Sequence, residues 1–145
     1  MNDSLCRTTD QELLYELSYY TLAHSDPSFI HQHVVDAFAA QHADETTSPI
    51  AIVFALVGLY LHVEKGFNGK QVQRCHAQLA RRRNEWMRLT PPAARGAIEI
   101  RDVLAASAGT ERDAAIHRWC ASVWDAWSDS RGMIAALVRD ELGIE

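Results

Sequence analysis

The spacing of apolar residues along the chain predicts helices over most of its length. Leu13, Leu17 and Tyr20 recur at helical intervals and indicate a first helix over about residues 10–23. Asp-Pro and Ser-Pro pairs, which are typical of helix starts, introduce two more helices over about 27–42 and 49–65. The 49–65 segment is apolar on all sides, so we expect other helices to surround it.

The second half of the chain continues the helical pattern. Val72, Cys75, Leu79 and Trp86 form one apolar stripe of a helix over about 69–89, which Pro91 and Pro92 bring to an end. Further helices are expected over about 100–106, 110–128 and 131–142. No alternating β pattern is found. The sequence therefore predicts an all-α, single-domain helical bundle over 1–145, with an up-and-down four-helix core and a C-terminal helical extension.

Three segments resemble a family of small, uncharacterised bacterial proteins, a domain of unknown function. They are Phe29 to Gln41, Phe54 to Leu61 and Trp119 to Trp124, and the resemblance extends from about Tyr19 to Leu137. It implies a bacterial origin and a compact helical domain. It implies no activity and no site residue.

Composition places the chain among ordinary globular proteins. It has 145 residues, of which 48% are hydrophobic and 23% are charged. Its cysteines, Cys6, Cys75 and Cys120, are odd in number and widely spaced, which argues against a disulfide framework. The longest apolar run, Ile50 to Val63, is shorter than the roughly 20 residues of a membrane span. With no secretory signal at the N-terminus, we expect a cytoplasmic protein without a membrane partner.

Charge is distributed unevenly. Residues 1–64 carry nine acids and one arginine, 65–101 carry nine bases and two acids, and 102–145 carry eight acids and four bases. A basic segment of this kind marks either a nucleic-acid-binding face or a partner for the acidic segments, within the chain or across a dimer. We favour the second interpretation because the net charge is −5, so nucleic acid is not an expected partner. The candidate nucleic-acid contacts would be Lys70, Arg74, Arg81, Arg82, Arg83 and Arg88.

The histidines supply the candidate chemistry. If the first four helices run up and down, then Glu16, His33 and His76 share one level near Gly58, and His62 lies one turn away. Two or three imidazoles with a carboxylate suit Zn²⁺, Ni²⁺ or Fe²⁺ and leave an open position for water or substrate. The alternative is that these histidines make ordinary hydrogen bonds at the edge of the core.

Two further positions are candidates for a specific role. Arg83 falls within an apolar stripe, so we expect it to pair with Asp36 or Glu64 or to bind an anion. Trp124 lies to one side of its helix's apolar stripe and, if exposed, marks a dimer contact or a groove.

Two functions are compatible with these patterns. The first is a small cytosolic protein-interaction module that self-associates, most simply as a homodimer, because no catalytic motif is present and the charges of the segments are opposed. The second is a metal-dependent hydrolase or transferase that uses Glu16, His33, His62 and His76.

Overall fold

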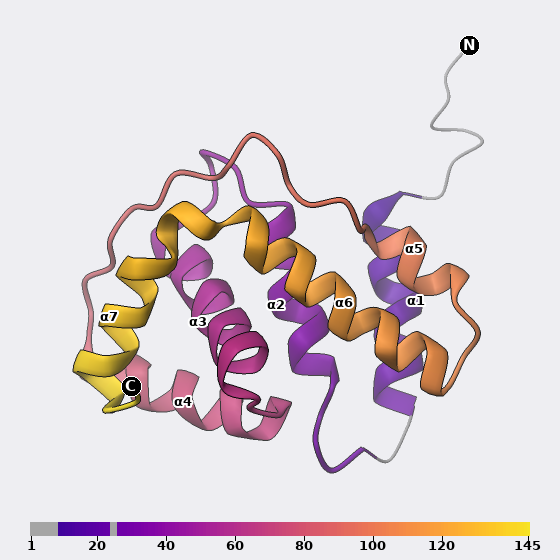
Figure 1. The fold of residues 1–145 in the computed structure, drawn as a ribbon, viewed down its shortest axis with the longest axis horizontal. Helices are drawn as coiled ribbons and strands as arrows, with labels where there is room; N and C mark the ends of the chain where they lie inside the picture. Colours follow the sequence, from indigo (N-terminus) through magenta and orange to yellow (C-terminus); the bar gives the residue numbers. More distant parts are fainter. Residues whose placement is uncertain (1–8, 24–25) are drawn as a thin grey trace.

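A computed structural model describes residues 9–23 and 26–145, and every regular element in these ranges is helical (Figure 1). The all-α class predicted from the sequence is confirmed. In chain order the elements are α1 (Asp10–Ala23), α2 (His31–Gln41), α3 (Pro49–Lys65), α4 (Gly69–Arg82), α5 (Ile100–Ala105), α6 (Thr110–Ala126), the short 3-10 helix η2 (Ser128–Ser130) and α7 (Arg131–Leu142).

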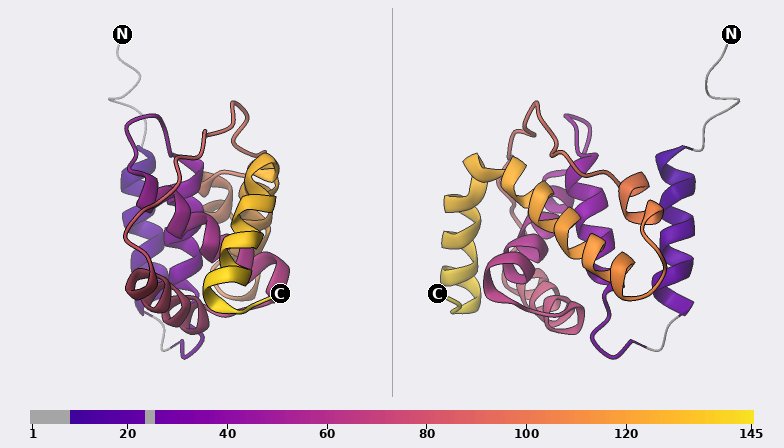
Figure 2. Two further views of the ribbon diagram at one scale, coloured as in Figure 1. Left: turned by 90° about the vertical axis from the view of Figure 1, so that its left-hand side faces the viewer. Right: turned by 45° about the vertical axis from the view of Figure 1, so that its right-hand side comes forward.

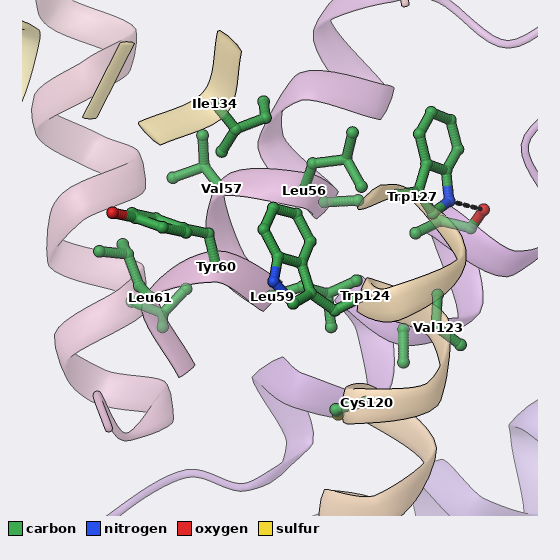
Figure 3. Close-up of a cluster of buried hydrophobic side chains, with 14 of the residues drawn as sticks. Leu56, Val57, Leu59, Tyr60, Leu61, Cys120, Val123, Trp124, Trp127 and Ile134 are labelled. Carbon is green, nitrogen blue, oxygen red and sulfur yellow. Dashed lines mark hydrogen bonds between the residues drawn. The ribbon is translucent and has the colours of Figure 1, made fainter. Parts of the chain in front are cut away.

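Helix α3 is the centre of the core. Ser48 caps it by accepting a hydrogen bond from the Ala51 amide, and Gly66 ends it in the left-handed conformation, with φ of 72°. Nearly all side chains between Ile52 and Leu61 are buried, and they pack against α6 and α7 as well as α2 (Figure 3). In the described part of the chain no helix is both long and apolar enough to cross a membrane.

The helices around α3 are arranged differently from the predicted core. Helices α2, α3 and α6 contact one another, so α6 belongs to the core and is not an extension. Helix α1 packs on α2 and α5 at one end of the molecule, and α7 packs on α3 and α4 at the other (Figure 2). Helix α4 runs across the bottom of the view in Figure 1. The up-and-down arrangement of the first four helices is therefore not confirmed.

A turn ahead of α2 makes this helix begin at His31, later than the 27–42 pattern suggests. The carboxylate of Asp26 accepts hydrogen bonds from the amides of Ser28 and Ile30, and Phe29 adopts a left-handed φ of 57°, which interrupts a helix. The turn lies close against Gly69 at the start of α4: a Cβ there would fall 1.7 Å from the Phe29 carbonyl oxygen. Gly69 therefore has no room for a side chain.

A long non-helical segment, residues 83–99, leads from α4 to α5, because α4 ends at Arg82 rather than at Leu89. Gln41, at the end of α2, is hydrogen-bonded to the part of this segment nearest α5. The Gln41 amide donates to the carbonyls of Arg95 and Ile98, and its oxygen accepts from the Trp119 indole at 2.9 Å. All three interactions are long-range, so this buried glutamine ties α2, the crossing segment and α6 together.

Candidate functional site

Three histidines from the three central helices meet at one pocket. His33 comes from α2, His62 from α3 and His117 from α6, and the pocket has a volume of about 330 Å³. Its other lining residues come from the turn before α2, the segment after α3 and the first turns of α6; they include Asp26, Ser28, Phe67, Asn68 and Asp113. The pocket therefore gathers two carboxylates and three imidazoles from segments distant in sequence.

A hydrogen-bond chain fixes the orientation of two of the imidazoles. The Nδ1 of His62 lies 3.0 Å from the Phe67 carbonyl oxygen, which only accepts, so this nitrogen carries the proton. The Nε2 of His62 is then an acceptor, and it receives the Nδ1–H of His117 at 2.9 Å. With both rings neutral, the chain ends at the Nε2 of exposed His117, which is left as an unprotonated acceptor.

His33 is the buried member of the group. Its ring stacks on that of His62, with centroids 3.5 Å apart, and only 3% of the residue is exposed. Burial, with smaller contributions from His62 and His117, lowers the pKa of His33 to about 3. Its Nδ1 has no hydrogen-bond partner among the described residues. The buried end of the cluster is thus neutral at physiological pH.

The carboxylates of Asp26 and Asp113 give the pocket its negative charge. Partial burial acts to raise the pKa of Asp26, but hydrogen bonds from the Ser28 hydroxyl and the Ile30 amide outweigh it, so this pKa is lowered. Asp113 accepts a hydrogen bond from the Tyr20 hydroxyl at 2.8 Å. Within the described residues neither carboxylate forms an ion pair with a lysine or arginine.

The structure brings together only two of the four residues proposed as metal ligands, His33 and His62. Glu16 is exposed on α1, which packs on α2 and α5. The ring of His76 stacks on Phe54, and its Nε2 is hydrogen-bonded to the Phe54 carbonyl at 2.8 Å. His76 is therefore one of the core-edge histidines of the alternative interpretation.

His117 was not among the sequence-based candidates. The level argument used only the first four helices, whereas α6 is the element that packs beside α2 and α3. A sequence signal was present, since Asp113 and His117 are four residues apart and so share one face of a helix. Among the described residues there is no group of three or more His, Cys, Asp or Glu side chains arranged to hold a metal ion.

Asp36 is not a partner of Arg83 but a buried carboxyl in the core. Its Oδ1 accepts from the Gln32 side chain at 3.2 Å, and its Oδ2 has no partner in the described structure. Burial raises the pKa of Asp36 well above its usual range, so the group is a neutral carboxylic acid. The carboxyl lies directly over Gly58 of α3: a Cβ built at this glycine would fall 1.9 Å from Oδ2 of Asp36.

The other predicted pairings are also different in the structure. Arg83 pairs with Glu141 of α7 at 3.3 Å, because the chain leaves the α4 helix at this residue and turns toward α7. Glu64 accepts from Arg131 and, at 2.7 Å, from the indole of Trp124. Trp124 is only 5% exposed, so it is part of the core and not a surface contact. Cys75 and Cys120 are buried free thiols, and Cys6 lies outside the described residues.

Comparison with known proteins places this architecture in a family. The model of a family of unknown function (DUF5946) matches residues 4–128. The chain belongs to this family. The resemblance to a domain of unknown function is thereby confirmed, and the DUF5946 match includes all three histidines of the pocket. Neither the curated proteins nor the solved structures give a match.

Proposed function

We propose that the protein is a helical interaction module that binds a second copy of itself, with α1 of one copy seated in a groove along α4 of the next. One observation carries this proposal. Tyr15, Tyr19 and Leu22 are the most exposed large apolar side chains of the described structure, at 66%, 69% and 57%. They lie at positions i, i+4 and i+7 of α1 and so form one stripe, the spacing of a helix that docks in a groove.

Helix α1 has apolar side chains on two opposite faces. Its inner face carries the buried Leu17 and Thr21 and the partly buried Leu13 and Leu14. A surface helix of a globular protein is expected to be polar on its outward side, whereas a helix that is apolar all round is enclosed. The outward stripe of α1 therefore suits a helix that a partner covers.

The groove along α4 offers a complementary surface. It has a volume of about 550 Å³ and is lined by apolar Phe67, Cys75 and Ala77 together with polar Gln71, Arg74, Gln78 and Arg81. Neither arginine has an ion-pair partner in the described part of the chain. Among the described residues the basic segment is thus largely unpaired, which leaves its charge available to an acidic partner.

Charge and length support a second copy as the occupant. Exposed Glu12 and Glu16 belong to α1, which contains no basic residue. Helix α1 has 14 residues and is about 21 Å long, and the part of the groove that belongs to α4, residues 69–81, spans about 20 Å of helix. An acidic, aromatic helix and a basic groove of similar length on the same molecule fit the opposed charges seen in the sequence.

The two surfaces lie on different parts of the molecule (Figures 1 and 2), so the contact is head-to-tail. A dimer formed in this way keeps one free α1 and one free groove, so further copies add to its ends as the protein concentration rises. A single helix against a groove buries less than a standard interface, so we expect a dissociation constant that is roughly micromolar.

Complementation between two variants tests this contact. Tyr15→Ala with Tyr19→Ala removes the exposed aromatic stripe of α1 without adding charge, and Arg74→Glu with Arg81→Glu disables the groove, so each variant alone is expected to be monomeric by sedimentation velocity. Mixed together, they retain one intact surface of each kind and should form a 1:1 heterodimer that does not grow further. Met133→Glu, which places a charge at an exposed apolar residue of α7, is the control and should associate as the unaltered chain does.

Three results would contradict the proposal. One is an unaltered chain that stays monomeric at hundreds of micromolar. Another is a groove variant that still associates while the α1 variant is monomeric, because that indicates an α1–α1 contact. The last is a failure of the two monomeric, folded variants to combine.

A further inference from the structure

We infer that the histidine pocket, lined by His33, His62 and His117, binds a small organic cation, an ammonium or guanidinium. The N–H groups of this cation would donate hydrogen bonds to His117 and to the carboxylates of Asp113 and Asp26. The inference does not depend on self-association. It rests on the acceptors, the charge and the shape of the pocket.

The acceptors are fixed before any ligand arrives. Because the Phe67 carbonyl holds the proton of His62 on Nδ1, and His62 in turn receives the Nδ1–H of His117, the free Nε2 of a neutral His117 is an acceptor. Asp113 lies four residues before His117, on the same face of α6. A ligand with two or more N–H donors can satisfy both groups at once.

The charge of the pocket favours a cation. Its lining contains two aspartates and no lysine or arginine. The turn before α2 keeps Asp26 ionised through the Ser28 hydroxyl and the amides of Ser28 and Ile30. Hydrogen bonds from a positively charged donor to such carboxylates are stronger than neutral ones, and a guanidinium makes them in pairs.

His33 forms the buried end of the pocket. His33 lines the pocket, is 3% exposed, and has an Nδ1 without a partner in the described structure, which is rare for a buried polar atom. The imidazole faces and the Phe67 ring next to it suit the methylene groups of an alkylamine. The volume of about 330 Å³ is in the range of small-molecule sites.

The experiment is a titration of the ¹⁵N-labelled full chain with agmatine and with 1,4-diaminobutane, followed by amide shifts and by long-range ¹H–¹⁵N spectra of the imidazoles. We expect both cations to shift the amides of residues 26–30, 66–68 and 113–117. The imidazole spectra should show His62 and His117 protonated on Nδ1. The neutral isostere 1,4-butanediol and the anion succinate should cause no such shifts.

Two variants separate the charge from the fold. Asp113→Asn keeps the shape of the side chain and should weaken agmatine binding by about tenfold or more, because a hydrogen bond to a charged group is lost. Asp125→Asn removes an exposed acid further along α6 and should bind as the unaltered chain does. The inference is overturned if agmatine leaves the pocket amides unmoved, if 1,4-butanediol binds equally well, or if the two variants bind alike.

A transition metal provides the competing outcome. For His62 to bind Zn²⁺, one of its ring nitrogens would have to give up its hydrogen bond to the Phe67 carbonyl or to His117. Tight Zn²⁺ binding with loss of both Nδ1–H signals, and no response to agmatine, would assign the pocket to a metal and refute the organic cation.

Discussion

Replacing Gly58 by alanine is expected to destabilise the fold, although alanine is ordinarily the better helix former. A Cβ built at this position falls 1.9 Å from Oδ2 and 2.6 Å from Cγ of Asp36. Both distances are far below van der Waals contact, and the Asp36 side chain is enclosed by the core, so the strain cannot be relieved by a simple rotation. Overpacking of this kind costs about 1–3 kcal/mol, sometimes more, against a helix-propensity gain of about 0.5–1 kcal/mol.

The difference between these terms is a net loss of about 1 kcal/mol, or roughly 4 °C in melting temperature for a domain of this size. The assay is urea and thermal unfolding of four proteins: the unaltered chain, Gly58→Ala, Asp36→Ala and the double variant. In the Asp36→Ala background the added methyl enters vacated space, so the substitution should cost little and the coupling between the sites should be about 1 kcal/mol. Gly132→Ala is the matched control.

No atom lies within 4 Å of the Cβ built at Gly132, so the control should gain about 0.5–1 kcal/mol. Should Gly58→Ala stabilise the protein as the control does, the close approach of the Asp36 carboxyl to α3 is wrong. Should it cost equally in both backgrounds, the loss has another cause than this carboxyl.

Three further predictions concern buried polar groups. The first concerns Asp36, whose pKa is raised in the folded state, so above about pH 4 the unfolded chain loses a proton that the folded chain keeps and the free energy of unfolding falls. Asp36→Asn should be as stable as the unaltered chain at pH 4 and more stable above it, by up to about 1.4 kcal/mol per pH unit. Equal urea midpoints at pH 8 would contradict this. The second concerns His33, whose pKa falls from 6.5 to about 3 on folding. Below pH 6.5 the unfolded chain binds a proton that the folded chain does not, so the free energy of unfolding falls as pH drops from 6.5 toward 3, by about 2 kcal/mol at pH 5. His33→Phe should therefore show a shallower acid limb in thermal melts. Gln41→Leu leaves the Trp119 indole and two carbonyls without partners and should cost about 2–4 kcal/mol by urea unfolding, whereas exposed Gln78→Leu should change stability by less than about 0.5 kcal/mol.

The sequence carried enough information for the class and for much of the local structure. Thr9 and Glu12 form a reciprocal capping pattern ahead of α1, and Ser48 and Gly66 delimit α3 as helix-capping chemistry predicts. These signals are local, because each depends on residues within one helical turn.

What the sequence did not provide is the arrangement of the helices around α3. The expected histidine cluster relied on sequential helices being neighbours, which holds for α2 and α3 and so unites His33 with His62. The third member of the pocket comes from α6, which also packs on α2 and α3, whereas α4 contacts the same two helices but places His76 against Phe54. Periodicity identifies which face of a helix is apolar, but it does not determine which other helix covers that face.

The place of α6 between two much earlier helices has a consequence for biosynthesis. The indoles of Trp119 and Trp127 reach back to Gln41 and Ala40, across 78 and 87 residues of chain. Until the ribosome has released α6, the apolar surfaces of α2 and α3 lack its cover, so we expect the emerging N-terminal half to be the stage most prone to aggregation. Such distant closure also makes folding slower than that of a helical bundle whose neighbours follow in order.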